Sequence, residues 1–160
     1  MAMDQFIKIG SLKGEAKDKA HKDEIDVLSW NWGLTSNGSF HSGGGGGAGK
    51  ASVQDLTFTH YIDKASPELI LACMNGKHLE WATLLVRKSG EKPLDYFMID
   101  MEPVIVTGVS TGGSHGEDRP IETVTLHFGK VEIYYVEQTP TGKGGAKIQM
   151  NWNIAENYSE

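Results

Sequence analysis

The sequence predicts a mainly β protein, an antiparallel β-barrel of about seven strands with one short helix packed at its side. Three observations favour this fold. Apolar and polar residues alternate along most of the chain, as they do in strands that bury one face. Glycine is abundant, with 20 of 160 residues, and glycine-containing turns separate the alternating stretches. One segment, residues 66–76, carries a helical pattern with recognisable ends.

The chain begins with a strand candidate followed by a charged segment. Residues 6–9 are expected to form a short strand. Residues 11–24 are dense in both charges and are interpreted as a solvated loop, with a charge-paired contact to a partner as the alternative. Residues 53–62 alternate between apolar and polar types, so a further strand is expected there.

Residues 28–34 show the most regular alternation in the chain. The face that should pack in the core carries Leu28, Trp30, Trp32 and Leu34. Ser29 and Asn31 point the other way, because neighbours on a strand face opposite sides. That second face is expected to be wet or to lie at an interface.

Residues 66–76 are predicted to form the helix. The Ser66 hydroxyl can cap the first turn, and Pro67 suits the first helical position. Gly76 can take the left-handed conformation that ends a helix. Residues 69–74 are apolar almost all the way round, so we expect the helix to be mostly buried.

The second half of the chain is expected to hold the remaining strands. Strands are predicted over residues 79–88, 94–109, 121–137 and 147–154. The mixed pattern of 79–88 predicts that both faces of this strand are covered. Pro103 cannot donate to a central ladder, which implies a bulge or an edge position. The apolar set of residues changes phase near Gly129 and Lys130, and one inserted residue in a β-bulge would explain this change.

Length, charge and cysteine content exclude several classes of protein. The 160 residues fit one domain over 1–160, and the net charge of −6 without a basic patch argues against nucleic-acid binding. No apolar run is long enough for a signal peptide or a membrane span. Cys73 is the single cysteine, so no internal disulfide can form. We interpret it as a buried structural thiol in a protein made in a reducing cytoplasm.

The sequence offers little catalytic chemistry. The 6 histidines show no metal-ligand spacing, and His60 and His127 lie in predicted strands, where a structural role is expected. Cys73 on a buried helix would be a poor nucleophile. Asp100 and Glu102 share one strand face and could hold a general acid and base, although such a pair more often simply marks a solvated face. We therefore expect no enzyme activity, no metal and no cofactor.

The glycine run near residue 45 approaches the phosphate-binding P-loop pattern. Residues 44–50 read as a glycine, four residues and then Gly-Lys. The next residue is Ala51 where that loop needs Ser or Thr, and a strand follows where it needs a helix. Nucleotide binding is therefore not expected, and the run is interpreted as a mobile connector that can order against a neighbour.

Several motifs, in this order and at these spacings, resemble the haemolysin-coregulated protein (Hcp) family, the inner-tube proteins of the bacterial type VI secretion system. The motifs are FIKIG at 6–10, KGE at 13–15, EIDVLSWNWG at 24–33, GGGGGAGK at 43–50, QDLTFTHYIDKASPEL at 54–69, GKH at 76–78, VSTGGSHGEDRPIETVTLHFGKVEIYY at 109–135 and WNI at 152–154. The resemblance covers nearly the whole chain. It implies a β-barrel with one helix at its side and no catalytic activity.

The resemblance also implies a function and partners. Members of the family form six-membered rings that stack into a hollow tube, and a contractile sheath drives this tube and its spike from a baseplate out of the cell. Effector proteins can be held in the lumen. This chain would then be made in the cytoplasm and secreted by the type VI system without a signal peptide, with no nucleic acid among its partners and no membrane insertion.

The resemblance places two candidate sites. Ser29 and Asn31 would face the channel and contact effectors. A second site would contact the next ring in the stack, through Gly43, Gly44, Gly45, Gly46, Gly47, Ala48 and Gly49. Two alternatives stay open at this point. One is a lectin-like β-barrel binding module, and the other is a hydrolase that uses Asp100 and Glu102.

Overall fold

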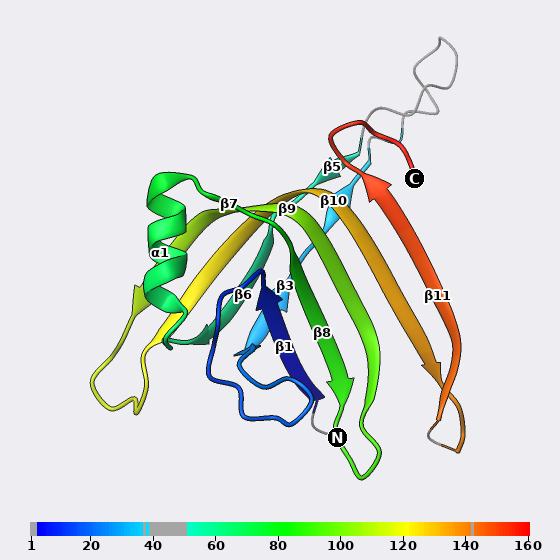
Figure 1. Cartoon of the computed structure of the whole chain (residues 1–160), viewed down its shortest axis with the longest axis horizontal. Coiled ribbons are helices and arrows are strands. Elements are labelled where there is room, and N and C mark those ends of the chain that lie inside the picture. Colours follow the sequence, from blue (N-terminus) through cyan, green and yellow to red (C-terminus); the bar gives the residue numbers. More distant parts are fainter. Residues whose placement is uncertain (1–2, 37, 39–50, 142) are drawn as a thin grey trace.

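The computed structural model describes residues 3–36, 38, 51–141 and 143–160. It shows a strongly curled antiparallel sheet with one short helix at its side, as the sequence predicts (Figure 1). The strands are β1 (Met3–Ile9), β2 (Ile25–Asp26), β3 (Ser29–Asn31), β4 (Leu34–Thr35), β5 (Ser52–Val53), β6 (Leu56–Tyr61), β7 (His78–Leu79), β8 (Ala82–Lys88), β9 (Leu94–Gly112), β10 (Ile121–Gln138) and β11 (Gly144–Asn153). The helix is α1 (Ser66–Asn75).

The two ends of the curled sheet meet at one segment of the chain. The strand order is β2-β1-β8-β9-β10-β6-β3, with β11 added to β10 and β7 to β9. β2 and β3 are consecutive, and the residues between them bond to both ends of the sheet. The Val27 N–H donates to the Gln5 carbonyl, and the Leu28 N–H donates to the Thr59 carbonyl. This segment therefore joins β1 to β6. Beyond the joined part, β9, β10 and β11 extend as an arm at one side of the molecule (Figure 1).

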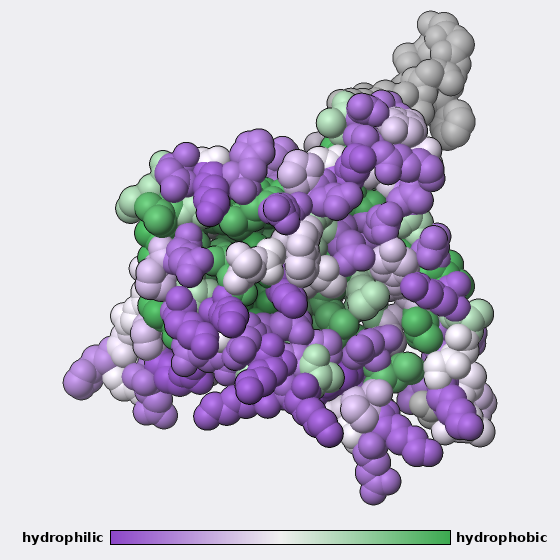
Figure 2. Space-filling model, viewed as in Figure 1, coloured by the Kyte–Doolittle hydropathy of each residue, from purple (hydrophilic) through white to green (hydrophobic). Residues whose placement is uncertain are grey.

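Helix α1 lies against the side of the sheet and is less buried than predicted. It packs on β9 through a narrow stripe that includes Leu69 and Ala72. Leu71 and Met74 are exposed, and Figure 2 shows apolar surface over α1. The prediction of a mostly buried helix is wrong, because only one side of α1 meets the sheet.

The helix ends differ in how well they were predicted. Gly76 ends α1 in the left-handed conformation, with φ 67°, which confirms the prediction. Ser66 does not cap the helix, because it is already the first helical residue and its hydroxyl accepts the Asp63 N–H. Asp63 organises this end instead, with its Oδ1 accepting the Ala65 N–H at 2.9 Å.

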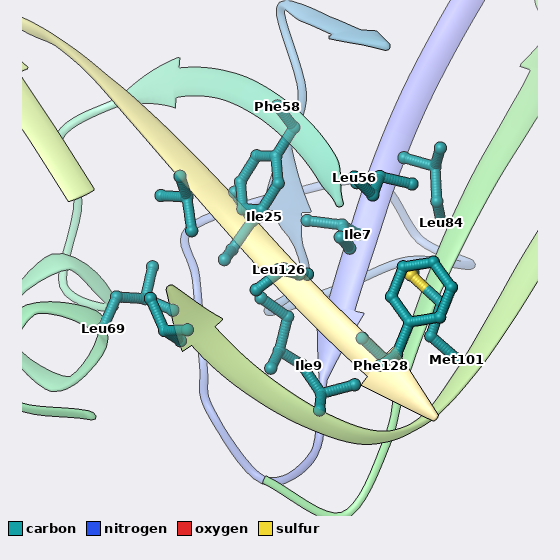
Figure 3. Close-up of a cluster of buried hydrophobic side chains, with 14 of the residues drawn as sticks. Ile7, Ile9, Ile25, Leu56, Phe58, Leu69, Leu84, Met101, Leu126 and Phe128 are labelled. Carbon is teal, nitrogen blue, oxygen red and sulfur yellow. The ribbon is translucent and has the colours of Figure 1, made fainter. Parts of the chain in front are cut away.

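The core lies inside the curled sheet, where β6 and β10 contribute alternate residues. Leu56 and Phe58 on β6 and Val124 and Leu126 on β10 are fully buried. Figure 3 shows Phe58 and Leu126 converging with Ile7 and other apolar side chains. A change such as Phe58→Ala would leave a cavity in the centre of this cluster.

Residues 11–24 pack over the second face of β1 and β8. Ala16 is buried there with Phe6 and Leu85 in a small second core. Asp18 from the same segment forms an ion pair with Arg87 on β8 at 2.6 Å. The interpretation of this segment as a solvated loop is therefore right only for its outer side, where its lysines are exposed, because its inner side covers a face of the sheet. The covering explains why β8 is buried on both sides, as predicted.

The strand predicted over residues 28–34 is interrupted. β3 ends at Asn31, and β4 pairs with β5 in a separate two-stranded ribbon. Leu28 and Leu34 are exposed, so their predicted place in the core is wrong. Trp30 and Trp32 are partly buried and pack against the core.

Neither Pro103 nor Gly129 lies at a shift in the β9–β10 register. β9 and β10 keep one register on both sides of Pro103 and Gly129, which lie opposite each other but make no ladder pair. The phase change is therefore shared by both strands without an inserted residue, and the predicted bulge at Gly129 is wrong. Pro103 lies within β9 at a break in pairing, between the segments that pair with β7 and β8, and so avoids donating to either neighbour. The register between β9 and β10 shifts instead near Thr125.

Candidate functional site

The outward side of the sheet carries a patch of short polar side chains, which we call the hydroxyl face. It consists of Ser29 and Asn31 on β3, Thr57 and Thr59 on β6, Thr123 and Thr125 on β10, and Ser110 on β9. On β6 and β10 these residues alternate with buried core residues, and on β3 they flank the partly buried Trp30, so the core fixes their outward direction. The cross-strand register places them in rows, because residues directly opposite on paired strands share a face.

The hydroxyl face has two rows, one across β3, β6, β10 and β9 and the other across β3, β6 and β10. Ser29 lies opposite Thr59, and their hydroxyl oxygens are 2.6 Å apart. Asn31 lies opposite Thr57, whose hydroxyl oxygen is 3.4 Å from that of Thr125. These side chains carry no formal charge, and each can donate or accept a hydrogen bond. The face can therefore bind varied polar partners without a strong charge preference.

A hydrogen-bonded polar cluster borders the hydroxyl face. Asp55 precedes β6, and its carboxylate bonds to His127 Nδ1 at 2.7 Å and to the Thr107 hydroxyl at 2.9 Å. The arrangement resembles part of a catalytic triad, but the Thr107 hydroxyl donates to Asp55 and not to the second ring nitrogen of His127. The cluster therefore fixes side-chain positions without activating a nucleophile.

Both predicted channel residues, Ser29 and Asn31, are exposed on the hydroxyl face. Between them, Trp30 points inward and stacks on Phe97 with ring centroids 5.9 Å apart. The predicted stacking residues 43–49 lie outside the described residues, so their role stays a prediction. The sequence did not identify Thr57 and Thr125 as site residues, because only the strand register places them beside Asn31.

The alternative acid–base pair lies in a shallow hollow elsewhere. Asp100 and Glu102 line a space of about 270 Å³ together with Trp81 and Trp152. The Thr83 hydroxyl donates to Asp100 Oδ1 at 2.6 Å. The two carboxylates thus share a wall of this hollow, as their positions on β9 predict.

Three further features concern Cys73, metal binding and membrane-spanning helices. The Cys73 thiol is free and packs against the core, but it is only partly buried, so the prediction of a buried thiol is met only in part. Among the described residues, no group of three or more His, Cys, Asp or Glu side chains could hold a metal ion. Nor does any helix in this part of the chain have the length and apolar character to cross a membrane.

Two exposed apolar patches lie on opposite sides of the molecule. The helix patch consists of Leu71, 58% exposed, and Met74, 81% exposed, on α1. The strand patch consists of Tyr135 on β10 with Ile148 and Met150 on β11, and Ile148 is 62% exposed. Ile148 lies directly opposite Tyr135 in the β10–β11 register. Figures 1 and 2 show α1 at one side and β11 at the other, with apolar surface along each.

Comparisons with known proteins agree on one family. The family described as "Type VI secretion system effector, Hcp" matches residues 6–135. Protein hcp1 of Pseudomonas aeruginosa is 54% identical over 159 residues, which are 98% of each chain.

Solved structures agree as well. The crystal structure of Hcp1 from Salmonella typhimurium is 41% identical, with a TM-score of 0.84 over 100% of both chains. A type VI secretion system effector from Yersinia pestis is 39% identical, with a TM-score of 0.78 over 94% of this chain and 99% of the other.

Proposed function

This chain belongs to the Hcp family, the tube proteins of the type VI secretion system, and from that premise we propose that six copies join head to tail into a closed ring. The family is structural and non-catalytic. The hydrolase alternative built on Asp100 and Glu102 is therefore wrong, and the lectin-like alternative loses its basis.

The observation that carries the ring proposal is the position of the two apolar patches. Exposed apolar clusters on a protein surface mark sites of association. The helix patch and the strand patch lie on different elements at opposite sides of one subunit. A contact between unlike patches repeats from copy to copy and closes into a ring when its rotation allows. Family membership supplies the expected number of copies.

Light scattering combined with electron microscopy of the purified protein tests the ring. We expect a mass of six 17.5 kDa chains and particles with a central hole. A single-chain mass at micromolar concentration would contradict the proposal.

We extend the proposal to cargo and to the other parts of the machine. Rings would stack into the tube through residues 43–49, within a sheath and below a spike attached to the baseplate. The hydroxyl face would line the channel and contact effectors through Ser29 and Asn31. Secretion would use the type VI route without a signal peptide.

Asn31→Arg tests the channel assignment. The side chain of Asn31 is exposed and stands on a strand whose inward residue, Trp30, keeps its own packing. We expect folded rings of normal size. Retention of effectors should fall roughly tenfold, because six bulky charges enter one channel. The measurement is co-purification of an effector that unmodified rings retain.

Ser114→Arg is the matched control for this experiment, because it adds the same charge to the exposed loop between β9 and β10. Equal effector recovery from the Asn31 and Ser114 variants would remove Asn31 from the channel wall. Loss of the ring in the Asn31 variant would place this residue at a subunit contact instead.

A further inference from the structure

A buried histidine lies between two carboxylates near the start of α1. His60 on β6 is 1% exposed, and Glu122 on β10 is 0% exposed. The two residues are direct partners in the β6–β10 register, and His60 Nε2 is 2.9 Å from Glu122 Oε1. On the other side of the ring, His60 Nδ1 is 3.7 Å from Asp63 Oδ2, which is ion-pair range but too long for a hydrogen bond.

The cluster is electrostatically complete only when His60 is protonated. A neutral imidazole has one N–H, so one of the two carboxylates would face a nitrogen lone pair. Burial alone would lower the pKa of His60, but Asp63 and Glu122 outweigh this effect and raise the pKa above its ordinary value. Asp63 and Glu122 are the charged groups with the largest effects on the pKa of the ring.

Asp63 connects this cluster to the helix. Its Oδ1 accepts the Ala65 N–H, its backbone N–H donates to the Ser66 hydroxyl, and its carbonyl accepts the Ser66 N–H. The carboxylate that faces His60 therefore also organises the turn that starts α1. Further out, Asp63 lines a charged hollow with Glu15, Lys17, Asp26, Tyr61 and Arg119.

The helix that starts at this turn carries the helix patch. Leu69 anchors α1 in the core, while Leu71 and Met74 stand on its exposed side. A small change in how the first turn sits on the sheet would move Leu71 and Met74 together, because a helix of 10 residues behaves as a rigid element. The cluster around His60 can thus act on a surface that the ring requires.

We propose that His60 is a proton-dependent latch, whose protonated ring holds Asp63 and the start of α1 in the position that subunit contact needs. The assembly part of this inference rests on the proposed ring, whereas the latch itself does not. A histidine whose pKa is raised on folding stabilises the folded form fully below its unfolded value of about 6.5. That stabilisation is lost as the pH rises through the folded value. Rings should therefore loosen on the alkaline side of neutrality.

The first test follows the unmodified protein by NMR, with carbon-13 in the histidine rings and in selected methyl groups. We expect the His60 ring to lose its proton above about pH 6.5. The methyl signals of Ala65 and Leu69 should shift with the same midpoint, whereas Ile99 on β9 should not. A neutral His60 ring throughout, or helix methyl signals that ignore its titration, would overturn the latch.

The second test measures free subunit by sedimentation at about pH 6.5 and about pH 9, where we expect on the order of tenfold more free subunit at the higher pH. His60→Gln should remove this dependence, and the matched control His127→Gln, which changes an exposed histidine, should keep it. Equal pH dependence in unmodified and His60→Gln rings would overturn the proposal.

The two tests separate the latch from the ring. A protein that is monomeric at every pH contradicts the ring proposal, while the NMR titration still decides the latch. If His60→Gln does not fold, Glu122→Gln replaces it, and its expected result is a lower His60 midpoint in the same NMR experiment. An unchanged midpoint in that variant would count against the cluster as described.

Discussion

Replacing Ile148 and Met150 together by lysine is expected to convert the ring into folded single subunits. Both side chains are exposed on β11, so the isolated subunit should tolerate the change within about 0.5 kcal/mol. At a subunit contact, each lysine would bury an unpaired ammonium, which typically weakens association by about 2 kcal/mol or more. Because the same contact recurs around the ring, light scattering should show no ring at micromolar concentration.

Two controls make this result specific to the proposed contact. Gln149→Lys places a lysine on the opposite face of β11, with one added charge instead of two, and should leave rings intact. Leu71→Lys with Met74→Lys changes the helix patch and should also give single subunits. Rings that survive the strand-patch change would remove β11 from the contact.

Mixing the two lysine double variants tests the head-to-tail geometry. One variant keeps an intact helix patch, and the other keeps an intact strand patch. A contact between unlike patches allows one productive pairing, so the mixture should form a dimer and grow no further. A mixture that stays monomeric would show that the two patches do not meet each other.

The strands that bury one full face were predictable from the sequence. On β6 and β10, the alternation of apolar and polar residues agrees with the burial of Phe58 and Leu126, because the curled sheet covers that face along its length. The same reasoning failed at Leu34. There the chain leaves the main sheet, and the Trp32 indole N–H donates to the Gln54 carbonyl beside the separate β4–β5 ribbon. Nothing in the local alternation marks that departure.

The helix and the sheet arm show a second limit. Leu71 on α1 and Ile148 on β11 have the local pattern of buried residues, yet both are exposed in the subunit. An apolar pattern predicts that a surface is covered, but it does not say whether the same chain or another copy covers it. Sequence reasoning therefore assigns a surface for subunit contact to the core of the single chain.

The candidate site could be predicted only in part for a related reason. Alternation alone placed Ser29 and Asn31 on an outward face, because neighbours on one strand are enough for that argument. The Asp55–His127 contact joins residues 72 positions apart, and it depends on the register between β6 and β10. The pairing of His60 with Glu122 depends on the same register.

Arg87 is the residue whose replacement should weaken the subunit itself most clearly among the polar side chains. It is 7% exposed, and its guanidinium donates to Asp18 from both terminal nitrogens and to Asp4 from one. It also lies over the Phe6 ring, 5.2 Å from the ring centroid. The pairing with Asp18 raises the pKa of Arg87 and holds the pKa of Asp18 well below its usual range.

Arg87→Met is therefore expected to destabilise the fold by roughly 2–3 kcal/mol, because it leaves two carboxylates facing an apolar side chain. Urea unfolding measures this change, and limited trypsin digestion should cut residues 11–24 faster once Asp18 loses its partner. Arg87→Lys is the matched control, since one ammonium keeps the charge but cannot bind Asp18 through two nitrogens. The free energy of unfolding of Arg87→Lys should lie between those of the unmodified protein and Arg87→Met.

Since the pKa of Asp18 is lowered, the unmodified protein should lose this stabilisation only as the pH falls below about 4. The Arg87→Met protein should lack that acid-dependent loss. An unchanged urea midpoint in Arg87→Met would show that packing of Ala16, and not the ion pair, holds the segment in place.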